Sequence, residues 1–106
     1  MATYIALLTF TEKGTQEIKR TTARAAAFRE MAEKRGIRIL KTFWLNGPFD
    51  GVHIFEVDKE EDALAHSFSL SSFGNVRTQT YRALSEDEVE PILAGISDPF
   101  DLLRRD

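Results

Sequence analysis

Two short turn segments, each followed by an apolar run of strand character, constrain the fold of this chain more than any other feature. The first is Leu45-Asn46-Gly47-Pro48-Phe49-Asp50 and the second is Gly74-Asn75-Val76-Arg77-Thr78. Asn-Gly between two apolar runs is typical of a hairpin, and glycine after a helical pattern is typical of a helix end. The two segments therefore predict where the third and fourth strands begin.

Period-two runs of apolar residues predict four strands. They cover residues 3–11, 37–45, 49–57 and 76–83. In the first run both parities are apolar, with Tyr4 on one face and Ile5 on the other, which is typical of a strand buried on both sides. In the second run, Trp44 falls on the face opposite Ile39, so the two side chains are predicted to lie on different sides of the sheet.

Helical spacing of apolar residues predicts three helices. They cover residues 14–36, 58–73 and 85–95. Asp58 with Glu61, and Ser85 with Glu88, have the spacing of a capping box, in which each residue of the pair bonds the backbone N–H of the other. Gly36 stands where a C-terminal cap is expected for the first helix.

The order of these elements predicts an α+β, ferredoxin-like βαββαβ fold with a short C-terminal helix. Right-handed crossovers place the two main helices on one face of a four-stranded antiparallel sheet. The other face stays bare, although it is expected to carry Trp44 and one apolar parity of the first strand. Because an exposed apolar face of this size favours association, we expect a homo-oligomer, most simply a homodimer that packs two sheets together.

Length and composition indicate one soluble domain. The chain has 106 residues, of which 42% are hydrophobic and 29% charged, so it can bury one core and does not resemble a membrane protein. We assign residues 1–95 to the domain and residues 96–106 to a C-terminal tail, where one more turn is expected. No basic start with a following apolar stretch is present, so we expect a cytoplasmic protein.

Residue content disfavours several classes of partner and cofactor. The chain has no cysteine, and His53 and His66 are too few and too far apart in sequence to indicate a metal site. Residues 13–41 hold nine basic and three acidic residues, but without the aromatic pattern of a base-stacking surface. We therefore expect a solvated face, or one paired with a partner subunit, and no nucleic acid, metal or cofactor.

Polar and aromatic residues on the predicted strands are candidates for a site. A cleft for a small, partly apolar anion combines aromatic walls with a few polar groups. The predicted ligand-binding residues are Trp44, His53, Arg77, Tyr81, Tyr4 and Asn75. The catalytic candidates are His53 and Asp50, since histidine suits proton transfer near neutral pH and Asp50 follows a turn.

Each candidate also has a structural interpretation. Asp50 is placed to accept backbone N–H groups in the hairpin, and Asn75 is suited to a cap. A lone His53 on a central strand is also typical of a hydrogen-bonded core residue. Arg77 is expected to be held by an acid, either Asp50 or one of a neighbouring subunit. His66 is expected at the surface or partly buried.

Several of these segments resemble the GYD-domain family, a group of small bacterial and archaeal proteins of uncharacterised function. The resemblance spans residue 3 to about residue 93 and is carried by Thr3-Tyr4-Ile5, Phe10-Thr11-Glu12-Lys13-Gly14, Ile18-Lys19, Gly47 with Phe49-Asp50, and Gly74-Asn75-Val76-Arg77-Thr78 with Arg82-Ala83. It implies a ferredoxin-like domain similar to the dimeric α/β-barrel group. That group contains cofactor-free monooxygenases, haem-degrading enzymes, isomerases and amino-acid-sensing modules.

Two departures from the family pattern bear on function. Phe49 stands where the family tends to have tyrosine, so a phenol hydroxyl is not essential at this position. His53 stands where the family tends to have an apolar residue, so any role of His53 is peculiar to this protein. A family without an assigned activity transfers its fold and little else.

Two functions from different classes stay open at this point. One is an oligomeric small-molecule-binding domain that acts as a cofactor-independent enzyme, in which His53 or Asp50 moves a proton and Arg77 holds an anion. The other is a non-catalytic ligand-sensing or assembly module. A cavity that His53, Asp50 and Arg77 all reach would favour the enzyme, and a packed interior would favour the module.

Overall fold

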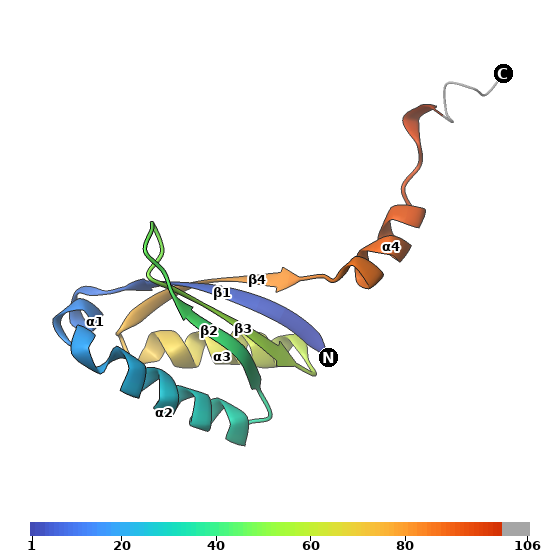
Figure 1. Ribbon diagram of the computed structural model, residues 1–106. Helices are drawn as coiled ribbons and strands as arrows, with labels where there is room; N and C mark the ends of the chain where they lie inside the picture. Colours follow the sequence, from blue (N-terminus) through green and yellow to red (C-terminus); the bar gives the residue numbers. More distant parts are fainter. Residues whose placement is uncertain (101–106) are drawn as a thin grey trace.

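The computed structural model describes residues 1–100, along which strands and helices alternate (Figure 1). The elements are β1 (Ala2–Phe10), α1 (Glu12–Gln16), the 3-10 helix η1 (Ile18–Arg20), α2 (Thr21–Lys34), β2 (Arg38–Trp44), β3 (Gly51–Val57), α3 (Glu60–Ser72), β4 (Val76–Ala83) and α4 (Glu86–Ala94). Only part of the predicted tail, residues 96–106, falls within the described range. The expected turn there extends beyond the described residues.

The four strands form one antiparallel sheet in the order β2-β3-β1-β4. Helices α2 and α3 lie together on one face of this sheet (Figure 1). The α+β, ferredoxin-like fold predicted from the sequence is therefore confirmed, with α4 as the extra C-terminal helix. The two edges of the sheet are β2 and β4.

The core lies between the sheet and the two helices. Alternate residues of the central strands supply it, and Phe55 and Val57 of β3 are fully buried. Tyr4 of β1 stacks on Phe55 with ring centroids 5.6 Å apart. From the helices, Ala32 and Ala63 are also buried. Small side chains at these two positions let the helices approach the sheet closely.

An irregularity in β2 changes which side chains face the helices. Ile39 pairs with Phe55, but the next paired residue is Lys41, opposite Ile54. One extra residue in a strand reverses the parity of everything after it. Trp44 therefore lies on the helix-covered side, opposite Gly51, and its predicted place on the bare face is wrong.

The helix ends agree with the predictions in part. The predicted helix over residues 14–36 is divided into α1, η1 and α2, and Gly36 ends it with a φ of +79°. Ser85 and Glu88 form the predicted capping box. Asp58 does not cap α3, because the helix begins one residue later than expected, with Lys59 at the cap and no side-chain bond there.

The face of the sheet away from α2 and α3 carries no other element of residues 1–100. Ile5, Leu7 and Ile54 are half-buried on it, while Phe43 and Tyr81 are about half exposed, at 52% and 53%. The bare apolar face predicted from the sequence is thus present in the chain, though with Phe43 rather than Trp44 as its large side chain on β2.

Candidate functional site

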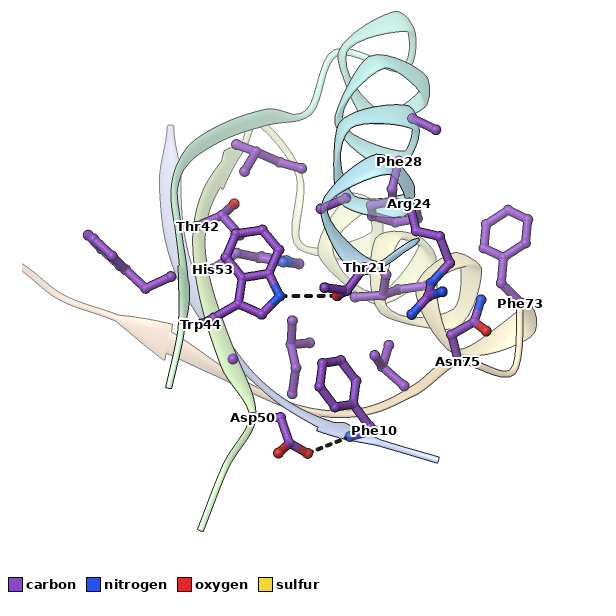
Figure 2. A pocket seen from close by; sticks show the side chains of 18 of the residues that line it. Phe10, Thr21, Arg24, Phe28, Thr42, Trp44, Asp50, His53, Phe73 and Asn75 are labelled. Carbon is purple, nitrogen blue, oxygen red and sulfur yellow. Dashed lines mark hydrogen bonds between the residues drawn. The ribbon is translucent and has the colours of Figure 1, made fainter. Parts of the chain in front are cut away.

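A cavity of about 250 Å³ lies between the sheet and helix α2 (Figure 2). Its walls are mostly apolar, and few polar side chains reach it. The main apolar and aromatic lining residues are Leu8, Phe10, Phe28, Met31, Ile39, Phe43, Trp44, Leu70, Phe73 and Val76. Its polar lining residues are Thr21, Arg24, Thr42, Asp50, His53 and Asn75.

One face of α2 supplies the helical wall of this cavity. Thr21, Arg24, Phe28 and Met31 line it and follow one another at intervals of three or four residues. Residues at these intervals lie on the same side of an α-helix. The polar Thr21 and Arg24 stand in the first turns of α2, so this wall is polar toward the start of the helix.

Trp44 joins the edge strand to α2 beside the cavity. Its indole N–H donates to Thr21 Oγ1 at 3.0 Å, and Figure 2 shows this bond between strand and helix. The indole remains 45% exposed. Trp44 thus forms part of the cavity wall and also contacts solvent, which makes its fluorescence a direct reporter of this site.

Arg24 is the cationic residue of the cavity. Its guanidinium donates to the backbone carbonyls of Glu17 at 2.7 Å and of Gly14 at 3.5 Å. A guanidinium has five N–H donors, so these two bonds fix its position and leave donors for another acceptor. No carboxylate of residues 1–100 pairs with it.

The turn at the start of α1 is bound to the segment before β4. Thr11 N–H donates to the Asn75 carbonyl at 3.0 Å, and Thr11 Oγ1 donates to the Gly74 carbonyl at 2.5 Å. A Cβ on Gly14 would collide with the Asn75 carbonyl oxygen, so only glycine fits there. Gly74 itself has a φ of +78°, a conformation that also favours glycine.

This packing places the Asn75 side chain at the cavity. Its Oδ1 is buried and has no hydrogen-bond partner among residues 1–100. A buried acceptor without a partner costs free energy, so such groups in proteins usually bond to water or a ligand. Asn75 therefore offers a polar contact point at the end of the cavity near Phe73 (Figure 2).

His53, which lines the cavity, forms a buried pair with His66. The Nε2 atoms of His53 on β3 and His66 on α3 lie 3.1 Å apart, and the residues are 4% and 2% exposed. Phe28 and Phe55 pack against the His66 ring, at centroid distances of 5.0 Å and 4.4 Å. At this distance one imidazole donates and the other accepts, so the pair shares one proton between the two Nε2 atoms.

Burial keeps both imidazoles neutral. Loss of solvation, together with the neighbouring His66, lowers the pKa of His53 to about 3. Loss of solvation and the nearby Arg35 guanidinium lower the pKa of His66 to about 4. At neutral pH the pair therefore carries no charge, and His53 presents a neutral ring to the cavity.

Comparison with known proteins agrees with this fold. The model of the GYD domain matches residues 4–93. The chain belongs to the GYD-domain family. It is 27% identical over 85 residues to the "Glutamine synthetase and cystathionine beta-lyase binding protein" of Thermus thermophilus, an alignment that covers 79% of this chain and 90% of the relative. No solved structure matches the chain.

The GYD domain brings together some of the predicted site residues and separates others. Trp44, His53 and Asn75 line the cavity. Tyr4 lies on the same face of the sheet but in the core, where it lines a second, shallow hollow beside α3. Arg77 and Tyr81 pair with Thr9 and Ile5 and therefore lie on the opposite, open face, away from the cavity.

The structure also places the two charged candidates, the catalytic candidate Asp50 and the ligand-binding candidate Arg77. Asp50 lines the cavity, but its carboxylate accepts from the Phe10 backbone N–H at 2.8 Å, as its structural interpretation predicts. Arg77 is exposed and makes no ion pair among residues 1–100, so the expected acid partner is absent from this part of the chain.

Sequence reasoning missed two polar residues of the GYD domain's cavity region. His66 was expected near the surface but is buried against His53, because α3 is rotated so that Ala63 and His66 face the sheet. Arg24 was grouped with the solvated basic residues. Its position four residues before Phe28 is the signal that places it on the inward face of α2.

Two negative findings complete the description of residues 1–100. No group of three or more histidine, cysteine, aspartate or glutamate side chains is arranged to hold a metal ion. None of the helices in this range has the length and apolar character needed to cross a membrane.

Proposed function

We propose that this GYD domain binds a small, largely apolar organic anion in the cavity between the sheet and α2. One observation carries the proposal: the Arg24 guanidinium, which has no carboxylate partner within residues 1–100, stands in the wall of a mostly apolar cavity. An aromatic or branched carboxylate fits both features, since its body would replace water on the apolar walls and its charge would meet Arg24.

Asn75 and His53 add specificity to this proposal. The unpaired Asn75 Oδ1 favours a ligand that also carries an O–H or N–H group. The neutral His53 ring favours contact with an uncharged part of the ligand. Arg24 takes the role that the sequence suggested for Arg77, and Trp44 remains part of the ligand-binding wall.

We favour binding over catalysis as the role of the cavity. A general base works best when its pKa is near the working pH, whereas the pKa of His53 is about 3. Asp50 is engaged by the backbone of Phe10. A cofactor-independent enzyme is the second candidate, supported by the position of His53 at the cavity. Proton NMR of the bound ligand over hours separates the two, because only an enzyme converts it.

The relative from Thermus thermophilus supports a role as a module that binds other proteins. That protein is named for binding two other proteins. We propose by analogy that this chain presents a surface to a protein partner and that ligand in the cavity changes that surface. Binding to candidate partners should then differ between ligand-free and ligand-saturated protein, and equal binding in both states would contradict this part of the proposal.

We also propose that the chain is a homodimer through its open sheet face. Support comes from the half-buried Ile5, Leu7 and Ile54 and the exposed Phe43 and Tyr81, which together leave an apolar surface without a covering element. Size exclusion with light scattering at micromolar concentration should give twice the chain mass of 12.0 kDa. A monomer at this concentration would contradict an obligate dimer.

The ligand proposal is tested with Trp44, the single tryptophan. Aromatic carboxylates and small organic phosphates are titrated while the tryptophan emission is followed. We expect a saturable change with a carboxylate, and Arg24→Gln should weaken its binding by roughly 10- to 100-fold, as for loss of a charged hydrogen bond. Arg77→Gln is the matched control, since it removes the same charge from the other face. Equal effects of the two variants, or no saturable change, would overturn the proposal.

A further inference from the structure

Helix α4 leaves the domain as an arm whose apolar side has no partner within residues 1–100. It continues from the end of β4 away from the sheet and both main helices (Figure 1). Ile92, Leu93 and Ile96 are 53%, 52% and 63% exposed, and they follow Val89 at helical spacing. An isolated helix of this length is marginal in water, so its apolar side needs a surface to cover it.

The direction of the arm is fixed at its base. Arg82 donates to Glu88 at 2.8 Å and to the Thr3 carbonyl of β1 at 3.1 Å. Ser85 and Glu88 form the capping box that starts the helix. These bonds tie the first turn of α4 to the sheet edge, so the helix cannot fold back over its own domain without breaking them.

The surface that complements the arm lies at the opposite edge of the sheet. Leu40, Phe43 and Leu45 in and after β2 are 41%, 52% and 40% exposed, and Trp44 between them is 45% exposed. Strand β2 is an edge strand, separated from β4 by β3 and β1. Both surfaces are thus apolar, exposed and at opposite ends of the same sheet.

The charges of the two surfaces are also complementary. Helix α4 carries four acidic residues and no basic one: Glu86, Asp87, Glu88 and Glu90. Residues 18–44, which form η1, α2 and β2, carry eight basic and two acidic residues. Opposite charges around an apolar contact favour association and set its orientation.

We propose that α4 of one chain docks on the β2 edge of a second copy, and that α4 of the second copy docks on the β2 edge of the first. This proposal rests on the homodimer proposed above. A two-fold axis parallel to the strands places β4 of one chain beside β2 of the other, so each subunit contributes one arm and binds one. Because Trp44 lines the cavity, the partner's arm would cover one side of the ligand site.

Single introduced cysteines test the exchange, because the natural chain has none. Chains carrying Leu93→Cys and chains carrying Phe43→Cys are co-expressed and treated with a short bismaleimide crosslinker. We expect an efficient crosslink between them, since neighbouring groups in one assembly have effective concentrations on the order of millimolar, about a thousandfold above micromolar free chains. Leu64→Cys replaces Phe43→Cys in the control, because Leu64 is equally exposed but lies on α3.

The outcomes separate this proposal from the dimer itself. A crosslink of Leu93→Cys to Phe43→Cys that is up to about a thousandfold faster than to Leu64→Cys supports arm exchange. A dimer by light scattering that gives equal crosslinking at both positions overturns arm exchange and leaves the sheet-to-sheet dimer standing. A monomer by light scattering overturns both.

Charge reversal provides an independent second test. Glu86→Lys with Glu90→Lys in the Leu93→Cys chain should slow the crosslink, and Lys41→Glu in the Phe43→Cys chain should restore part of the loss. Restoration depends on direct opposition of the two surfaces, so it would not follow from a general loss of stability. A slowed crosslink without any restoration would count against docking at β2.

Discussion

The two faces of the sheet are built from the same strands and are both apolar, but they are buried to different extents. On the face covered by α2 and α3, Phe55 and Val57 are fully buried, whereas on the open face Ile54, the residue before Phe55, remains half-buried. The difference does not come from hydrophobicity, since these residues are all apolar. It comes from the crossover connections, which put both helices on one side.

The comparison also explains why the predicted site residues separate. His53 and Arg77 both lie on strands, but His53 pairs with Ala6 and faces the cavity, whereas Arg77 pairs with Thr9 and faces outward. A difference of one position in register decides the face of every side chain on a strand. The proposed ligand site therefore lies on the covered face, and the surface proposed for assembly lies on the open face.

The largest expected difference between the faces is in stability. Phe55→Ala removes a fully buried ring and leaves a cavity, so the free energy of unfolding should fall by about 3–5 kcal/mol. Tyr81→Ala on the open face, where the ring is 53% exposed, should cost much less in the separated subunit. Urea denaturation at protein concentrations low enough to separate the subunits measures both free energies of unfolding. Similar losses of stability in the two variants would contradict the contrast between the faces.

The histidine pair makes the covered face sensitive to acid. The pKa values of His53 and His66 are lowered to about 3 and about 4, while an unfolded histidine titrates near 6.5. The unfolded chain therefore binds more protons below this pH, and stability that is complete above about pH 6.5 is lost as the pH falls toward these lowered values. We expect a loss on the order of 2–3 kcal/mol for each of the two histidines by about pH 4.5.

A substitution and an NMR measurement check this interpretation. In the variant with His53→Gln and His66→Gln, the slope of stability between about pH 6.5 and pH 4.5 should become shallower, because glutamine does not titrate. In the wild-type chain, the ring resonances of the two histidines should not shift between pH 8 and about pH 5.5. A normal titration near pH 6.5 for either histidine would show that the pair is not buried as described.

The pattern of the sequence was sufficient for the strands and for the fold class, because strand periodicity and turn residues are local signals. The predicted strand 76–83 coincides with β4, and the capping box at Ser85 is present. Trp44 was assigned to the wrong face because the irregularity after Ile39 leaves no mark in the alternation. His66 and Arg24 were missed because their environment depends on the rotation of α2 and α3, which packing decides.

A substitution at the cavity end of the covered face is expected to cost less stability than one in the core. Gly14→Ala drives a Cβ into the Asn75 carbonyl oxygen, a contact with backbone that cannot move aside as a side chain would. The turn at Thr11 must then shift, at a cost of about 1–3 kcal/mol, as for other overpacked sites. Thermal denaturation of Gly14→Ala beside Gly47→Ala, where a Cβ meets nothing within 4 Å, tests this, and equal melting temperatures would contradict it.

The smallest effect is expected at Arg77, and it tests the separation of the faces most directly. Arg77 is exposed and has no ion pair within residues 1–100, so Arg77→Gln should change the stability of the separated subunit by less than about 0.5 kcal/mol. Ligand-dependent Trp44 emission should also be unchanged, because Arg77 lies on the face away from the cavity.

In the assembled protein the same substitution becomes informative. If the open face meets a second copy, Arg77 lies at the subunit contact, where an acid of the partner would hold its charge. Arg77→Gln should then leave the isolated subunit unaffected but raise the dissociation constant of the dimer, which analytical ultracentrifugation measures. Arg77→Lys should recover little of that loss if the contact is bidentate, because an ammonium group does not reproduce the planar geometry of a guanidinium. An unchanged dissociation constant for both variants would place Arg77 outside the subunit contact and leave the apolar residues of the open face as the basis of assembly.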